Sequence, residues 1–112
     1  MLPELSTLDQ IAEAIESAKK KRVLLLLKFG AQWCKPCKMI APVAERIVKT
    51  NQERIMGFEV DVDVVKETLT QFQVSKLPTF ILIQNGNVHS TWTGSSSQEL
   101  EDRIYNAIDT TK

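Results

Sequence analysis

Both cysteines of the chain stand in one short segment, Trp33-Cys34-Lys35-Pro36-Cys37-Lys38. A strand-like apolar run precedes this segment and a helical pattern follows it, so we expect Cys34 at the first turn of a helix. Unpaired backbone N–H groups and the positive end of the helix dipole favour thiolate over thiol at that position. Cys37 follows one turn later, close enough to close a small disulfide ring with Cys34. The spacing indicates a dithiol that can accept and release a disulfide.

Helical and strand-like patterns alternate around this pair. Apolar residues recur at helical spacing in four segments, which run from Leu8 to Ala18, from Ile40 to Val48, from Val65 to Phe72 and from Leu100 to Ile108. Strands are expected at 23–27, 55–62, 79–83 and 88–93. Capping boxes are predicted for Thr7 with Gln10 and for Ser96 with Glu99. The resulting order is α-β-α-β-α-β-β-α.

This order predicts the fold class. Helices between the first strands imply right-handed parallel crossovers, and Asn85-Gly86 signals a type I′ hairpin that adds an antiparallel edge. The continuous apolar run at 23–27 is typical of a strand buried on both faces. No linker or repeat interrupts the pattern. We therefore expect an α/β fold with a central mixed β-sheet flanked by helices on both faces, in one domain over residues 1–112.

Composition excludes several kinds of protein. Fourteen basic and fourteen acidic residues cancel, which argues against a nucleic-acid or anionic-membrane surface. The longest apolar run, at 23–27, is far too short to span a bilayer, and the N-terminus lacks the features of a signal peptide. Two cysteines confined to one redox-type motif fit an intracellular reducing compartment. We expect the cytoplasm, with the mitochondrial matrix as the alternative, and a monomer.

The segment from Ala31 to Pro42 strongly resembles the active-site segment of thioredoxins. The resemblance continues, in the expected order, through 60–63, 74–80, Asn85-Gly86 and Gly94. It covers nearly the whole chain from about residue 20 to the end. W-C-x-P-C-K together with a later x-P-T-F is a specific signal, whereas a lone C-x-x-C is weak. The resemblance implies a thioredoxin fold.

It also implies a thiol–disulfide oxidoreductase that exchanges disulfides of client proteins. Cys34 would attack a substrate disulfide and form a mixed disulfide, and Cys37, more buried, would resolve it. Pro78 would be the cis-proline beside the cysteines, and Leu77 would offer its backbone to an extended substrate segment. No bound cofactor is implied. An external reductase or a low-molecular-weight dithiol would recharge the cysteine pair.

Further residues complete the implied substrate-binding set. Trp33 would pack over the site, and Gly94 would leave room for the substrate chain. Lys35 and Pro36 lie between the two cysteines and border the same surface. Lys35 replaces the glycine of typical thioredoxins, and its charge should stabilise the Cys34 thiolate and make the couple somewhat less reducing.

Lys28 is the largest departure from the family pattern. Its position usually carries a buried aspartate that helps to take the proton of the resolving cysteine. Glu59 falls at the corresponding height of the neighbouring predicted strand, so we hypothesise a buried or half-buried Lys28–Glu59 pair in which Glu59 takes over the relay through water. The cation near Cys37 should favour its thiolate. The alternative is that Lys28 extends its amine to solvent and has no chemical role.

Gly30 is a third departure from the family pattern, and the three departures together suggest an alternative function. Gly30 replaces an aromatic or small residue of the family pattern, which removes packing area next to the site and should enlarge the groove. With Lys28 and Lys35, it indicates a specialised variant with weak general reductase activity. The alternative function is therefore a redox-regulated thioredoxin-like chaperone or adaptor that holds polypeptides around Trp33, Gly30 and Pro78.

The remaining candidates have simpler interpretations. A structural zinc site needs about four protein ligands, and the chain offers two cysteines and the single histidine His89. We therefore predict no metal site. His89 and Trp92 fall on the predicted edge hairpin, where we expect His89 at the surface and Trp92 in packing or on the exposed edge. Asp61 and Asp63 are interpreted as polar residues at a strand end.

Overall fold

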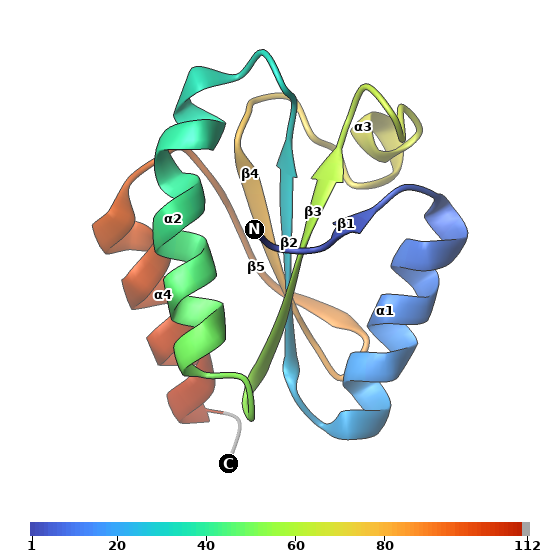
Figure 1. Ribbon diagram of the computed structural model, residues 1–112. Helices are drawn as coiled ribbons and strands as arrows, with labels where there is room; N and C mark the ends of the chain where they lie inside the picture. The colour runs from blue at the N-terminus through green and yellow to red at the C-terminus, as the bar shows by residue number, and fades with distance from the viewer. Residues whose placement is uncertain (111–112) are drawn as a thin grey trace.

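The computed structural model describes residues 1–110. Its elements, in chain order, are β1 (Glu4–Leu5), α1 (Leu8–Lys21), β2 (Leu24–Gly30), α2 (Lys35–Thr50), β3 (Ile55–Asp61), α3 (Thr68–Gln71), β4 (Thr79–Gln84), β5 (Asn87–Thr93) and α4 (Ser97–Thr110). Helices α2 and α4 cover one face of the sheet, and α1 and α3 lie on the other (Figure 1). Within this part of the chain no helix combines the length and apolar character that crossing a bilayer requires.

The strands form one mixed sheet in the order β1-β3-β2-β4-β5. β1 and β2 run parallel to β3, β4 runs antiparallel to β2, and β5 antiparallel to β4. The predicted α/β fold with helices on both faces is confirmed. The predicted order omitted β1, because a strand of two residues carries no periodic pattern. Its pairing arises only in the folded chain, where Glu4 and Leu5 lie beside Glu59 and Val60.

Local sequence signals explain where the elements begin and turn. The Thr7 hydroxyl accepts the N–H of Gln10 at 3.0 Å, and the Ser96 hydroxyl accepts the N–H of Glu99 at 3.1 Å. The N-cap half of each predicted capping box is thereby confirmed. The reciprocal half is not, because Gln10 Oε1 accepts the N–H of Ser6 at 2.6 Å instead of that of Thr7, and Glu99 Oε2 accepts from Arg103 at 3.0 Å. The turn between β4 and β5 has positive φ at both central residues, 53° at Asn85 and 80° at Gly86. Such angles define the predicted type I′ turn.

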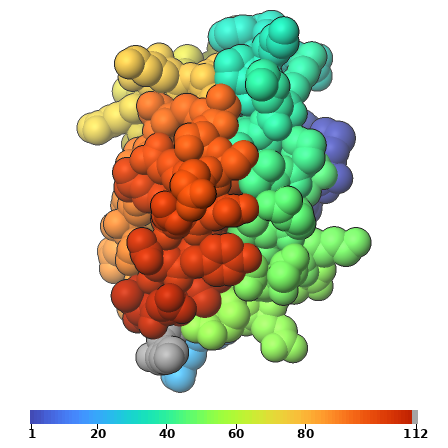
Figure 2. Space-filling model, turned by 90° about the vertical axis from the view of Figure 1, so that its left-hand side faces the viewer, coloured from blue at the N-terminus to red at the C-terminus, as the bar shows by residue number. Residues whose placement is uncertain are grey.

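Alternating side chains of β2 pack into two separate hydrophobic cores. Leu25, Leu27 and Phe29 belong to the core beneath α1, and Leu24 and Leu26 belong to the core beneath α2 and α4. Figure 2 shows α4 beside α2 over this second face. By the same alternation Lys28 follows Leu24 and Leu26 onto the face that α2 covers. A charged side chain is therefore placed at the end of an apolar core.

Candidate active site

The cysteine pair lies at the first turn of α2. Cys34 is the N-cap residue, and its Sγ accepts the backbone N–H of Cys37 at 3.2 Å. Pro36 stands in the first turn, where a missing backbone N–H costs nothing. Cys34 and Cys37 form a disulfide, with Cα atoms 5.3 Å apart. The predicted position at the helix start and the predicted small ring are both confirmed.

The relative burial of the two cysteines differs from the sequence expectation. Each is 4% exposed in this oxidised form, so the expectation that Cys37 is the more buried is wrong here. The bonded sulfurs cover each other, which buries Cys34 as deeply as its partner. The two residues nevertheless border different hollows: Cys34 lines an outer groove, and Cys37 lines an inner pocket.

The outer groove has a volume of about 490 Å³ and contains most of the predicted substrate-binding residues. Its lining includes Trp33, Lys35, Pro36 and Leu77. Trp33 is 71% exposed, and its indole N–H donates to Asp63 Oδ2 at 2.8 Å. Sequence reasoning missed the role of Asp63, which also lines the groove and fixes the exposed ring.

Pro78 and Gly94 lie next to each other at the end of the sheet. The Leu77–Pro78 peptide bond is cis, as the resemblance implied. Gly94 N–H donates to the Pro78 carbonyl at 3.0 Å, although the two residues come from opposite ends of the β4–β5 hairpin. Gly94 has φ of 106°, and a Cβ there would meet nothing within 4 Å. The space that was expected at Gly94 is present.

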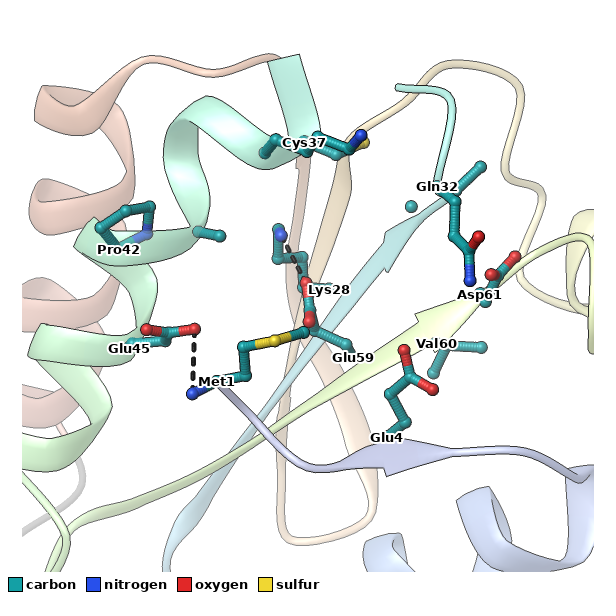
Figure 3. Close-up of a pocket in the computed structure, with 14 residues that line it drawn as sticks. Met1, Glu4, Lys28, Gln32, Cys37, Pro42, Glu45, Glu59, Val60 and Asp61 are labelled. Atoms are coloured by element: carbon teal, nitrogen blue, oxygen red, sulfur yellow. Dashed lines mark hydrogen bonds and ion pairs between the residues drawn. The ribbon is translucent and has the colours of Figure 1, made fainter. Parts of the chain in front are cut away.

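The inner pocket has a volume of about 390 Å³ and holds the Lys28–Glu59 pair. Lys28 Nζ lies 2.5 Å from Glu59 Oε1, with side-chain exposures of 2% and 20%. Figure 3 shows the pair in the middle of the pocket, with Cys37 at the upper end. The hypothesised pair is confirmed, and the alternative that Lys28 extends to solvent is wrong. The register of β2 and β3 pairs Lys28 with Glu59 directly, which makes the contact possible.

Gly30 lines the inner pocket and does not line the outer groove. The expected gain in space at Gly30 therefore concerns the inner pocket. A Cβ at this position would lie 3.1 Å from Cys37 Sγ. That separation is shorter than the usual carbon–sulfur contact, so any side chain at residue 30 would press on the disulfide. Gly30 and Cys37 both line the pocket, and Cys37 is 4% exposed.

Lys35, His89 and Trp92 differ in their distance from the cysteines. Lys35 is exposed beside Cys34, and His89 is exposed on β5. Trp92 is 5% exposed and stacks on Phe80 with ring centroids 5.3 Å apart, so the packing interpretation is confirmed. Within residues 1–110 no group of three His, Cys, Asp or Glu side chains is arranged to hold a metal ion.

Comparison with known proteins gives a consistent result. The family model described as Thioredoxin matches residues 6–106. Thioredoxin H4 of Arabidopsis thaliana is 33% identical over 90 residues, which are 80% of this chain and 76% of that protein. Thioredoxin of Bacillus subtilis is 33% identical over 90 residues, 80% of this chain and 86% of the relative. The structure of Fasciola hepatica thioredoxin is 30% identical, has a TM-score of 0.87, and the match covers 94% and 98% of the two chains.

Proposed function

Because this chain belongs to the thioredoxin family and is a thiol–disulfide oxidoreductase, we propose that Cys34 attacks disulfides of client proteins and Cys37 resolves the mixed disulfide. One observation carries this assignment. Cys34 is the N-cap of α2, where its sulfur accepts a backbone N–H and faces the positive end of the helix dipole. In the reduced protein these features stabilise the Cys34 thiolate, which is the attacking species.

The reaction runs in two exchanges. Cys34 thiolate bonds to one substrate sulfur, the substrate S–S bond breaks, and the other substrate sulfur leaves with the electron pair. Cys37 then loses its proton and attacks Cys34 Sγ, which expels the first substrate sulfur as a thiolate. The substrate gains two electrons and, after protonation, two thiols, while the protein is left with the Cys34–Cys37 disulfide.

Lys28 and Glu59 serve the second exchange. The Lys28 ammonium lines the same pocket as Cys37 and lowers the free energy of a thiolate there. Glu59 fixes the ammonium at 2.5 Å and remains 20% exposed, so it connects the buried pair with solvent. Its carboxylate is the group that takes the Cys37 proton, through water in the pocket. A lysine–glutamate pair thus has the role in removing the proton of the resolving cysteine that a buried aspartate usually has in this family.

The outer groove receives the client. Trp33 and Lys35 form its rim beside Cys34, and Leu77 contributes its wall next to the cis Pro78. An extended client segment lies along Leu77 with its disulfide over Cys34, and Gly94 keeps the adjoining surface free of a side chain.

The oxidised pair is recharged by an external reductase or by a small dithiol. We place the protein in a reducing compartment, in the cytoplasm or the mitochondrial matrix, because its two cysteines both belong to the redox pair. We further propose that residues 1–112 act as one domain and as a monomer.

A second candidate function is client holding. Two apolar side chains that line the outer groove are exposed, Trp33 at 71% and Leu69 at 42%, and Val64, which follows the groove residue Asp63 in the chain, is 61% exposed. Such a patch suits binding of unfolded segments. If the protein holds clients, disulfide formation alters the surface around Trp33 and thereby client binding, and reduction of client disulfides is slow.

One experiment separates the two functions. Reduction of insulin disulfides by dithiothreitol is followed with wild type, Cys34→Ser and Cys37→Ser. The oxidoreductase assignment predicts loss of turnover in both variants and a covalent insulin adduct on Cys34 of Cys37→Ser. Redox-dependent suppression of aggregation with negligible turnover by the wild type would instead support client holding.

A further inference from the structure

The inner pocket reaches the disulfide from a side that the outer groove does not. Its lining contains Cys37 but not Cys34, whereas the lining of the outer groove contains Cys34 but not Cys37. Gly30 forms part of the inner wall, and the position of its absent Cβ is 3.1 Å from Cys37 Sγ. The resolving sulfur is therefore bounded on the pocket side by a residue that has no side chain to cover it.

Exchange chemistry favours attack on this sulfur. A thiolate that attacks Cys37 Sγ expels Cys34, and the sulfur that leaves faster is the one with the more stable thiolate. Cys34 is that sulfur, because it accepts the Cys37 N–H at 3.2 Å and caps α2. Attack on Cys34 would instead expel Cys37, which shares its pocket with the Lys28 ammonium but is not the N-cap of α2. Attack on the sulfur that borders the inner pocket therefore expels the better leaving group.

The size and charge of the inner pocket restrict what can approach. A volume of about 390 Å³ suits a small organic molecule. Outside the Lys28–Glu59 pair the lining carries the carboxylates of Glu4, Glu45 and Asp61, and Figure 3 shows Glu45 on the left, Glu4 at the lower right and Asp61 on the right. It also carries Lys38 and the N-terminal ammonium of Met1, which pairs with Glu45 at 3.3 Å. With Glu59 and Lys28 included, four carboxylates face three cations, so the lining is slightly negative and disfavours an anionic thiol weakly. An uncharged dithiol meets no such cost.

We infer that the inner pocket admits a small uncharged dithiol, which recharges the oxidised protein by attacking Cys37 while the outer groove stays free for clients. This inference rests on the proposed function and names the reductant class that it left open. The sulfur at the N-cap of α2 reacts with client proteins, and the sulfur one turn later reacts with small dithiols.

The steps balance. One thiolate of the dithiol bonds to Cys37 Sγ, the Cys34–Cys37 bond breaks, and Cys34 leaves as a thiolate with the electron pair. The second thiol of the dithiol loses its proton and attacks its neighbour's sulfur, which expels Cys37 as a thiolate beside the Lys28 ammonium. The dithiol ends as a cyclic disulfide, having lost two electrons and two protons, and the protein regains both.

The first test measures the rate at which dithiothreitol reduces the oxidised full chain, with the freed thiols counted by alkylation and mass spectrometry. Gly30→Ala places a methyl group against Cys37 Sγ, and Ala41→Leu fills the pocket from α2 one turn beyond Cys37. Each is expected to slow reduction at least tenfold. Ser75→Phe is the matched change in the outer groove, and its rate is expected to stay within twofold of wild type.

The second test isolates the target sulfur. In Cys34→Ser the remaining thiol lies in the inner pocket, and its reaction with bis(2-hydroxyethyl) disulfide is followed by mass. We expect an adduct on Cys37, formed at least tenfold more slowly when Gly30→Ala is added. This reaction does not require the Cys34–Cys37 bond, so it reports access alone.

The outcomes distinguish this inference from the proposed function. Pre-reduced wild type is mixed with insulin for a single turnover, which depends on Cys34 and not on recharging. If both pocket variants are reduced within threefold of the wild-type rate, the inference is overturned, and single-turnover cleavage of insulin by the wild type would still support the proposed function. Slower reduction of Ser75→Phe than of either pocket variant would place the reductant at Cys34 and also overturn it.

Discussion

Removal of the Glu59 carboxylate should cost far more folding free energy than removal of its partner's charge. Lys28 is 2% exposed and has its Nζ 2.5 Å from Glu59 Oε1, whereas Glu59 is 20% exposed. At an effective dielectric constant of about 20, charges at this separation attract by roughly 7 kcal/mol before the cost of desolvation is subtracted. That cost cancels much of the attraction, so the pair itself stabilises little.

The two single variants differ in what they leave behind. Glu59→Ala leaves an ammonium buried without a partner, and the expected loss is about 3 kcal/mol of unfolding free energy. Lys28→Met keeps most of the side-chain volume and leaves a carboxylate that water in the pocket can reach. Its expected cost is at most about 1 kcal/mol. The double variant Lys28→Met with Glu59→Gln should regain most of the loss caused by Glu59→Ala.

Urea unfolding of the oxidised protein gives these values. The control is Glu101→Ala, which breaks the Arg46–Glu101 pair at 3.0 Å with exposures of 62% and 36%. An exposed pair of this kind contributes about 0–1 kcal/mol. The reasoning is refuted if Glu59→Ala costs no more than Glu101→Ala, or if Lys28→Met is the more destabilising member of the buried pair.

Three further predictions concern the outer groove. Lys35→Ala removes an exposed positive charge beside Cys34, so alkylation of Cys34 at neutral pH should slow about twofold at low salt, with the difference lost near 1 M salt. The same variant should shift the reduction potential by roughly 10 mV to more negative values, about 0.5 kcal/mol, as measured against glutathione. Asp63→Ala frees the Trp33 indole from its 2.8 Å hydrogen bond, and insulin reduction should lose severalfold in kcat/KM while the unfolding free energy changes by less than about 1 kcal/mol. Gly94→Val forces a branched residue to φ of 106°, so we expect a cost of about 1–3 kcal/mol together with slower insulin reduction; unchanged urea midpoint and turnover would contradict it.

Local features were predictable because nearby residues determine them. The helix start at Cys34, the two hydroxyl caps and the Asn85-Gly86 turn each depend on a few consecutive residues. The Lys28–Glu59 contact could also be predicted, because two parallel strands place residues of equal height side by side.

What escaped prediction depends on distant segments. The hydrogen bond from Trp33 to Asp63 joins residues 30 positions apart, and neither periodicity nor a motif marks it. The equal burial of the two cysteines, each 4% exposed, belongs to the disulfide-bonded form and is set by packing that the local sequence does not encode. The separate hollows beside Cys34 and Cys37 require the packed positions of α2, β2 and β3, which only the three-dimensional arrangement supplies.

The most direct measurement of the central claim is the pH dependence of iodoacetamide alkylation in the reduced protein, resolved for each cysteine by mass spectrometry. The account predicts that Cys34 reacts first and that its thiol has a pKa well below the value of about 8.5 for an unperturbed cysteine. A Cys34 that titrates at or above that value, or that reacts after Cys37, would contradict the account.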